Sequence, residues 1–143
     1  MDDAVKHLFE RYERLFNDAL AGAPDIEAIA ALYAAECIGA APAGVRTAHN
    51  DAPFRQALAQ GYAHYRAIGT KAMRMGAIRL TPIDALHCIA HVPWTATYAR
   101  PDLPETSIAF EVHYLVQTLD GTARVFGWIT GDETALLRQH GVV

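Results

Sequence analysis

The chain has 143 residues with a net charge of −4, and it is 52% hydrophobic and 20% charged, a composition typical of a folded globular protein with a sizeable core. We expect one domain over residues 1–143, and the negative charge without any run of Lys or Arg argues against nucleic acid as a partner. No apolar stretch approaches the ~20 residues that span a bilayer, and the charged N-terminal segment is unlike a signal peptide, so we expect a cytoplasmic protein with no membrane partner.

Two helical patterns begin the chain. Apolar residues recur at spacings of three and four over 2–21, which predicts an amphipathic helix. Glycine and proline follow it, and Asp25 is placed to cap a second helix over 26–36. Both helices should present one apolar face to a core.

A short irregular segment separates these helices from a third. Residues 37–47 contain two glycines and a proline, which predicts a hairpin or loop. Asn50 or Asp51 can cap the third helix, and Gly69 can end it in the left-handed conformation that glycine adopts readily.

The hydrophobic period then changes from 3.6 to two, which predicts strands. They are expected over 71–80, 85–99, 106–119 and 123–130. Pro93 cannot donate to a strand ladder, so we expect a bulge or an edge there. Asp132 can cap a short final helix. Helices followed by an antiparallel meander indicate the α+β class.

Element order and several local motifs resemble the nuclear transport factor 2-like superfamily, which includes ketosteroid isomerases, scytalone dehydratases and polyketide cyclases. The motifs are RYERL (11–15), DIEAIAALYAAE (25–36), VPW (92–94) and DGTARV (120–125). The resemblance implies a cone-shaped domain, with N-terminal helices packed in the concave face of a curved, mostly antiparallel sheet. Because the superfamily supports many activities, the fold alone does not identify the function.

Ketosteroid isomerases use an Asp general base, with a Tyr and a protonated Asp as an oxyanion hole. By the resemblance, Tyr12 takes the position of that Tyr. The base position falls on Ala41, before Pro42, and the second acid falls on Val112, Tyr114 or Leu115. Both carboxylates are missing, and no Asp or Glu lies on the strand faces assigned to the cavity. Steroid isomerisation by that mechanism is therefore excluded.

Aromatic residues dominate the strand faces expected to point inward. Trp94 and Tyr98 are four residues apart on one predicted strand, and Phe110 and Tyr114 are four apart on the next. Large rings with single polar atoms suit a flat apolar ligand. The predicted ligand-binding residues are Tyr33, Trp94, Tyr98, Phe110, Tyr114 and Trp128.

Two further residues are candidates for acid–base chemistry. Tyr12 lies in the apolar stripe of the first helix, and His64 lies near the edge of the buried face expected for the third helix. We therefore assign Tyr12 and His64 as the catalytic candidates. The sequence contains no cofactor-binding motif, and Cys37 and Cys88 are interpreted as small buried thiols.

Polar residues occupy the opposite face of the same strands. If Trp94 lies opposite Phe110, then His91 lies opposite His113 with Glu111 diagonal, and two imidazoles and a carboxylate could reach one metal ion. The alternative is a polar outer face, solvated or buried in a homodimer, and we assign no metal site from sequence. A homodimer is the expected assembly.

Three functions fit these patterns. The first is an isomerase, dehydratase or cyclase acting on a small hydrophobic or aromatic metabolite. The second is a protein that binds such a molecule without chemistry, and the third is an interaction domain that dimerises through its sheet. The missing carboxylates favour the second and third functions over a steroid-type enzyme, and the aromatic face favours the first two over the third.

Overall fold

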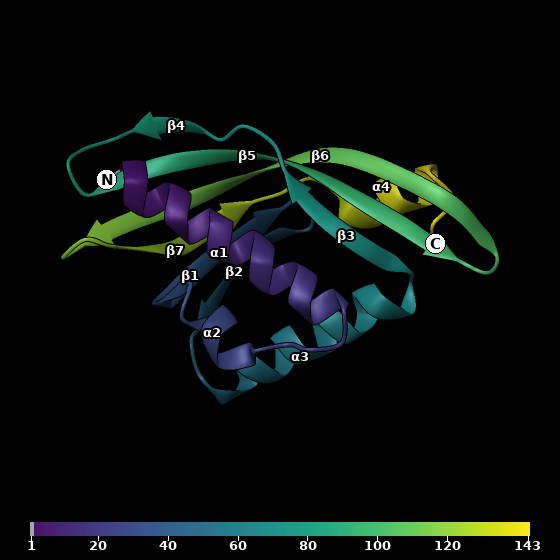
Figure 1. Ribbon diagram of the computed structural model, residues 1–143. Coiled ribbons are helices and arrows are strands. Elements are labelled where there is room, and N and C mark those ends of the chain that lie inside the picture. Colours follow the sequence, from purple (N-terminus) through teal and green to yellow (C-terminus); the bar gives the residue numbers. More distant parts are fainter. Residues whose placement is uncertain (1) are drawn as a thin grey trace.

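The computed structural model describes residues 2–143. In it, helices pack against the concave side of a curved sheet (Figure 1). The long strands β5 and β6 arch across the molecule, and α1 lies beneath them. The elements are α1 (Asp2–Leu20), α2 (Ile26–Ala30), β1 (Tyr33–Ala41), β2 (Gly44–His49), α3 (Ala52–Ala67), β3 (Thr70–Met75), β4 (Arg79–Pro82), β5 (His87–Arg100), β6 (Leu103–Leu119), β7 (Thr122–Ile129) and α4 (Glu133–Gln139).

The helices begin and end where the sequence indicates. Asp25 accepts a hydrogen bond from the Ala28 amide, and Asp51 accepts one from the Phe54 amide, which satisfies first-turn donors of α2 and α3. Gly69 follows α3 with φ of +91°, in the left-handed region where a side chain is disfavoured. The apolar stripe of α1 is buried against the sheet, as expected.

The predicted second helix is too long. It ends at Ala30, and Tyr33–Ala41 forms strand β1 instead. The reason is tertiary: β1 pairs with β2 on one side and with β7 on the other. The Asn50 amide also donates to the Ala30 and Tyr33 carbonyls, at 2.8 and 3.2 Å. These partners override the helix propensity of an alanine-rich segment.

The sheet has the strand order β2-β1-β7-β6-β5-β3, with β4 also paired to β5. All neighbours are antiparallel except β1 and β7, which are parallel. Trp94 lies opposite Phe110, and His91 lies opposite His113, which confirms the predicted register. The mixed α+β class and the mostly antiparallel curved sheet are therefore as expected.

The predicted strand over 71–80 is interrupted. Its two halves are β3 and β4, which pair with separate parts of β5 on either side of Pro93. Pairing between β5 and β6 continues through Pro93 without a shift. The missing amide of Pro93 thus interrupts the neighbouring strand rather than bulging β5, and the Gly76 amide donates to the Pro93 carbonyl at 2.8 Å across the break.

A register shift in β7 decides which aromatic ring faces inward. Tyr114 pairs with Trp128 and Val116 pairs with Val125, so Phe126 is the additional residue of a bulge. Val125 is fully buried and Trp128 also lies on the inner side, while Phe126 packs edge-on against His87. The bulge thereby bends the sheet around the core.

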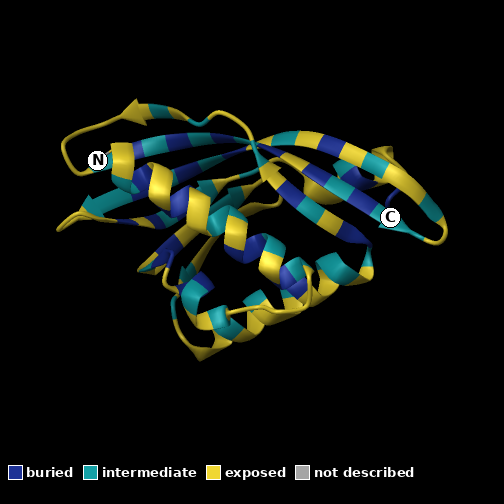
Figure 2. Ribbon diagram, in the orientation of Figure 1, coloured by how far each residue is buried: buried dark blue, intermediate teal, exposed yellow. Residues whose placement is uncertain are grey.

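Burial alternates along the long strands, as a sheet with one covered face requires. Figure 2 shows this alternation along β5 and β6. Val92, Ala96 and Val116, on the face that the helices cover, are fully buried. Within residues 2–143, no helix combines the length and apolar character needed to cross a membrane.

Candidate functional site

A cavity of about 570 Å³ opens between α1, the inner face of the sheet and the start of α4. Nine aromatic residues line it, and seven of them are ligand-binding or catalytic candidates singled out from the sequence. These seven come from α1, β1, β5, β6 and β7, and they are Tyr12, Tyr33, Trp94, Tyr98, Phe110, Tyr114 and Trp128.

The sheet brings these rings together through its register. Trp94 lies opposite Phe110 on β5 and β6, and Tyr114 lies opposite Trp128 on β6 and β7. Tyr12 enters from α1, with its ring centroid 5.6 Å from that of Trp94 and 5.8 Å from that of Tyr114. Aromatic rings at such separations attract one another beyond simple burial.

The rings differ in how much surface they expose. Trp94 is 2% and Tyr114 is 5% exposed, so both behave as core residues as well as lining the cavity. Tyr12, Phe110 and Trp128 are half-buried. A molecule entering the cavity would therefore contact these three rings first.

Two hydrogen bonds link the polar atoms of the cavity. The Tyr33 hydroxyl donates to the Tyr12 hydroxyl at 3.3 Å, and Trp94 Nε1 donates to the Tyr114 hydroxyl at 3.1 Å. Burial raises the pKa of Tyr12, and it raises the pKa values of Tyr33 and Tyr114 well above the ordinary value. These phenols are consequently neutral at physiological pH, and they can donate or accept hydrogen bonds but cannot act as bases.

A carboxylate that the strand pattern did not predict also borders the cavity. Glu133, the first residue of α4, accepts a hydrogen bond of 3.0 Å from the Tyr65 hydroxyl. Burial, followed by the charge of Glu133, raises the pKa of Tyr98 to about 12. The sequence analysis considered only the strand faces, so this carboxylate from α4 is an addition to the predicted lining.

Glu133 was missed for a local reason. The sequence marks Asp132 as a helix cap and Glu133 as a first-turn acid, and Asp132 does accept from the Ala135 amide. Nothing in that pattern indicates which way the helix turns relative to the sheet. Two other acids border the cavity, but Asp132 serves the cap, and Glu111 is directed to Arg79 and His113.

The structure does not place His64 in the cavity wall. Its side chain is exposed on α3 and does not line the cavity, whereas Tyr65, the next residue, does. The pattern assigned His64 to the edge of the buried face, but α3 turns Tyr62 inward instead. The expectation that His64 faces the cavity is therefore wrong.

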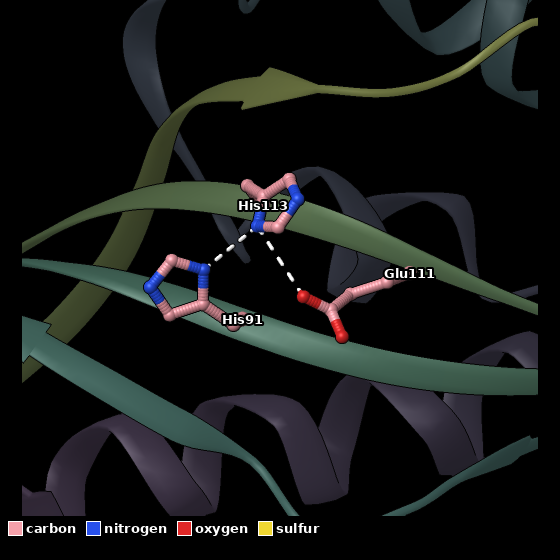
Figure 3. A group of neighbouring side chains, drawn as sticks. All are labelled: His91, Glu111 and His113. Carbon is pink, nitrogen blue, oxygen red and sulfur yellow. Dashed lines mark hydrogen bonds and ion pairs between the residues drawn. The ribbon is translucent and has the colours of Figure 1, made fainter.

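A polar cluster occupies the outer face of β5 and β6, and Glu111 is the only one of its three main residues that also borders the cavity. Figure 3 shows His91 and His113 facing each other across the strand pair, with Glu111 beside them. The two Nδ1 atoms are 2.7 Å apart, and His113 Nδ1 is 3.7 Å from Glu111 Oε1. Thr81 Oγ1 lies 2.7 Å from His91 Nε2. The predicted proximity of the three side chains is confirmed.

The two cysteines are free and buried, as expected. Burial raises the pKa of both the Cys37 and the Cys88 thiol. A raised pKa keeps them protonated at neutral pH, so they are poor nucleophiles.

Comparison with known families identifies the chain. A family model described as "NTF2-like protein (DUF6841)" matches residues 2–133, and the chain belongs to this family. Curated protein sequences include no match to it.

Solved structures share its fold at low sequence identity. An NTF2-like protein with a cystatin-like fold from Novosphingobium aromaticivorans is 17% identical with a TM-score of 0.70, over 95% of this chain and 88% of that one. A putative scytalone dehydratase from the same species is 14% identical with a TM-score of 0.66, over 89% and 80%.

A ketosteroid isomerase-like protein from Erwinia carotovora atroseptica is 16% identical with a TM-score of 0.63, over 90% of this chain and 93% of that chain. Similarity at these identities shows a common fold.

Proposed function

We propose that this NTF2-like protein binds a small, flat hydrophobic or aromatic metabolite in the cavity between α1 and the sheet. The observation that carries the proposal is the cavity of about 570 Å³ with its aromatic lining. That volume lies within the range of roughly 300–1,000 Å³ for small-molecule sites. Aromatic walls fit a planar ligand because they offer large contact areas at little entropic cost.

The polar atoms restrict the ligand further. The Tyr12 and Tyr114 hydroxyls already accept one hydrogen bond each, from Tyr33 and Trp94. Each hydroxyl retains its own proton, because burial raises its pKa. Tyr114 can donate its hydroxyl hydrogen to the Tyr12 hydroxyl. A ligand with a carbonyl or hydroxyl oxygen could accept a hydrogen bond from Tyr12, whereas a purely hydrocarbon ligand would leave the Tyr12 donor without a partner.

A second candidate is an enzyme of the isomerase, dehydratase or cyclase type. The observation that favours it is Glu133, whose carboxylate contacts Tyr65 at the cavity. Glu133 would remove a proton from a bound substrate, and Tyr12 would donate a hydrogen bond to the developing oxyanion. The fold similarity to proteins described as ketosteroid isomerase-like and as a putative scytalone dehydratase supports this candidate at the level of analogy.

A homodimer through the outer face of the sheet remains our proposed assembly. Helices α1, α2 and α3 occupy the concave side (Figure 1), and the opposite face carries exposed apolar residues beside the imidazoles. Ile38 is 40% and Ile129 is 48% exposed. Burying such side chains against a second copy would contribute roughly 25 cal/mol per Å² of apolar surface.

Intrinsic fluorescence tests the binding proposal directly, since the chain has two tryptophans and both Trp94 and Trp128 line the cavity. We would titrate the protein with 2-naphthol, a flat apolar probe with one hydroxyl, and follow tryptophan emission and the heat of binding. The proposal predicts saturable quenching at one site per chain. Quenching that rises linearly without heat of binding contradicts it.

Two variants separate the cavity from the remaining surface. Phe110→Ala removes a half-buried cavity ring, and we expect the affinity for 2-naphthol to fall by at least about tenfold. Phe126→Leu, on the outer side of the β7 bulge against His87, is the matched control and should bind normally. Equal affinities in the two variants would place the probe outside the cavity.

The enzyme candidate has its own test. Glu133→Gln keeps the shape of the side chain and removes its charge, so it should leave 2-naphthol affinity nearly unchanged. Turnover of any substrate would fall by roughly 10²–10⁴-fold if Glu133 is the general base. A variant with full turnover would remove Glu133 from the mechanism without affecting the binding proposal.

A further inference from the structure

We propose that His91, His113 and Glu111 form a binding site for one divalent transition-metal cation of the Zn²⁺ type on the outer face of the sheet. The three residues come from β5 and β6, and their ligand atoms all lie within 4.8 Å of one another. The proposal does not rest on the proposed ligand, and of the three residues only Glu111 also borders the cavity.

The spacing of the ligand atoms fits a single small cation. Two ligands of a tetrahedral Zn²⁺ with bonds of about 2.0–2.1 Å lie about 3.3 Å apart. The two Nδ1 atoms are 2.7 Å apart, and His113 Nδ1 is 3.7 Å from Glu111 Oε1. One of these distances is shorter and the other longer than about 3.3 Å. Small side-chain rotations that shift the ligand atoms by a fraction of an ångström would therefore give the tetrahedral geometry.

The strand register holds these side chains in place. His91 and His113 are direct cross-strand partners, and Glu111 is two residues from His113 on the same face. Side chains at such positions project from a rigid hydrogen-bonded ladder rather than from a mobile loop. Figure 3 shows His91 and Glu111 both directed toward Nδ1 of His113.

Thr81 on β4 supplies the contact that orients the first imidazole. Its Oγ1 lies 2.7 Å from His91 Nε2 and can accept a hydrogen bond from a protonated Nε2. In that tautomer, the lone pair of His91 Nδ1 is directed at the other two ligands. Metal-binding histidines are usually oriented in this way by a hydrogen bond at the second ring nitrogen. Thr81 lies opposite Ile89 in the β4–β5 pair, and Ile89 is two residues from His91 on the same face. The pairing of these strands therefore holds Thr81 near His91.

The donor set selects the class of cation. Two imidazole nitrogens and one carboxylate suit Zn²⁺ and its neighbours Co²⁺ and Ni²⁺, whereas Mg²⁺ and Ca²⁺ prefer oxygen ligands alone. Glu111 is exposed, while His91 and His113 are half-buried. In a single copy of the chain, a fourth position toward solvent is therefore left for water.

Arg79 moderates the affinity. Its Nη2 lies 3.1 Å from Glu111 Oε1, so its positive charge competes with a cation for the same carboxylate. Removing that charge by Arg79→Gln should strengthen binding about two- to fivefold, the effect expected of an exposed ion pair. Tighter metal binding by Arg79→Gln would indicate that the cation binds at Glu111. In a polar cluster without a metal site, the only role of Arg79 would be to stabilise the cluster.

The experiment uses the full chain without a histidine tag. Zn²⁺ affinity would be measured by competition with a chromophoric chelator, and Co²⁺ absorption in the visible range would report the coordination geometry. We expect one Zn²⁺ per chain. We also expect the visible absorption of bound Co²⁺ to be that of a four-coordinate ion. His91→Ala and His113→Ala should each weaken Zn²⁺ binding at least about 100-fold, more than the loss of a supporting contact.

His87→Ala is the matched control. His87 lies on the same strand and face as His91 but is held by Asp84 and Gln117, away from the site. Normal Zn²⁺ binding in this variant, together with its loss in the other two, supports the proposal. Circular dichroism would confirm folding, and His91→Gln would replace any variant that fails to fold.

Three results would overturn the proposal. They are no Zn²⁺ binding by the unmodified chain at millimolar concentration, unchanged affinity in either His91→Ala or His113→Ala, and a stoichiometry of one Zn²⁺ for two chains. The last result would mean that copies of the chain share the ion, rather than one chain supplying all three ligands.

Discussion

Trp94 Nε1 donates a hydrogen bond of 3.1 Å to the Tyr114 hydroxyl, which joins β5 to β6 on the cavity side of the sheet. Both residues are buried, at 2% and 5% exposure. Trp94, predicted from the sequence only as a ligand-binding residue, therefore belongs to the core and to the cavity at once.

The first prediction concerns the stability of this pair. Trp94→Ala should lower the free energy of unfolding by ~3–5 kcal/mol, the usual cost of deleting a buried aromatic ring. Tyr114→Phe leaves the buried indole N–H without its acceptor and should cost about 1–3 kcal/mol. Urea denaturation followed by circular dichroism measures both changes. A Trp94→Ala variant of normal stability would show that Trp94 is a wall only.

The second prediction concerns Gly39, which lies opposite Trp128 in the β1–β7 pair. A Cβ at Gly39 would lie 2.6 Å from the indole Nε1 of Trp128. Gly39→Ala should therefore displace this ring, alter tryptophan emission and weaken 2-naphthol binding, at a stability cost of about 1–3 kcal/mol. Gly61→Ala on α3 is the control, since nothing lies within 4 Å of its new Cβ. It should stabilise the chain by roughly 0.5–1 kcal/mol with unchanged emission.

The third prediction is a loss of stability in alkali. Burial raises the pKa of Tyr98 to about 12, and it also raises the pKa of Tyr12 and Tyr33 above the unfolded value near 10.0. A group with a raised pKa in the folded state contributes stability that is fully present below the unfolded pKa. That stability is lost as the pH rises through the folded pKa. The free energy of unfolding should accordingly decline from about pH 10 upward.

Denaturation with urea at pH 9, 10 and 11 measures that decline, and a constant free energy of unfolding would contradict it. Glu133→Gln refines the test, because the negative charge of Glu133 disfavours the phenolate form of Tyr98. The variant should lower the apparent pKa of Tyr98, seen as earlier phenolate absorbance in a spectroscopic titration of the folded protein. An unchanged titration would show that burial alone sets the pKa of Tyr98.

The fourth prediction concerns the proposed homodimer. Burial, the Arg79 charge and His113 lower the pKa of His91 below 6.5, against a smaller raising effect of Glu111, and Thr81 is the remaining polar neighbour. A lowered pKa means that the dimer face favours the neutral form of His91. The contribution of His91 to dimer stability is therefore present above the pKa of the unfolded chain and is lost on acidification. The dimer should loosen below about pH 6.

Sedimentation velocity at neutral and mildly acidic pH checks this expectation. His91→Gln removes the titrating ring and should make dimerisation less sensitive to pH. A chain that stays monomeric at neutral pH and high concentration would contradict the assembly itself.

Sequence patterns predicted the two long strands at the centre of the sheet better than the strands at its ends. The alternation along 85–99 and 106–119 indicated which residues share a face. The opposition of His91 and His113 followed from the assumed hairpin with Trp94 opposite Phe110, which the structure confirms. The strand at Tyr33 was missed because an alanine-rich segment favours a helix until β7 offers it a partner. Local patterns carry no such long-range information.

The candidate site divides in the same way. The inward rings followed from periodicity, which fixes the face of a strand on which each residue lies. Glu133 and His64 depended on how α4 and α3 turn against the sheet, and periodicity does not determine that rotation. Thr81 contacts His91 from β4, and the sequence pattern, which predicted one strand over 71–80, did not indicate how β4 pairs with β5.

The most direct test of the central claim is a crystal structure of the protein with 2-naphthol. The account predicts electron density for a flat ring in the cavity, in contact with Tyr12, Phe110 and Trp128, with its oxygen within hydrogen-bond distance of Tyr12 or Tyr114. Density only at the outer face of β5 and β6, or a cavity closed by its own side chains at saturating 2-naphthol, would contradict it.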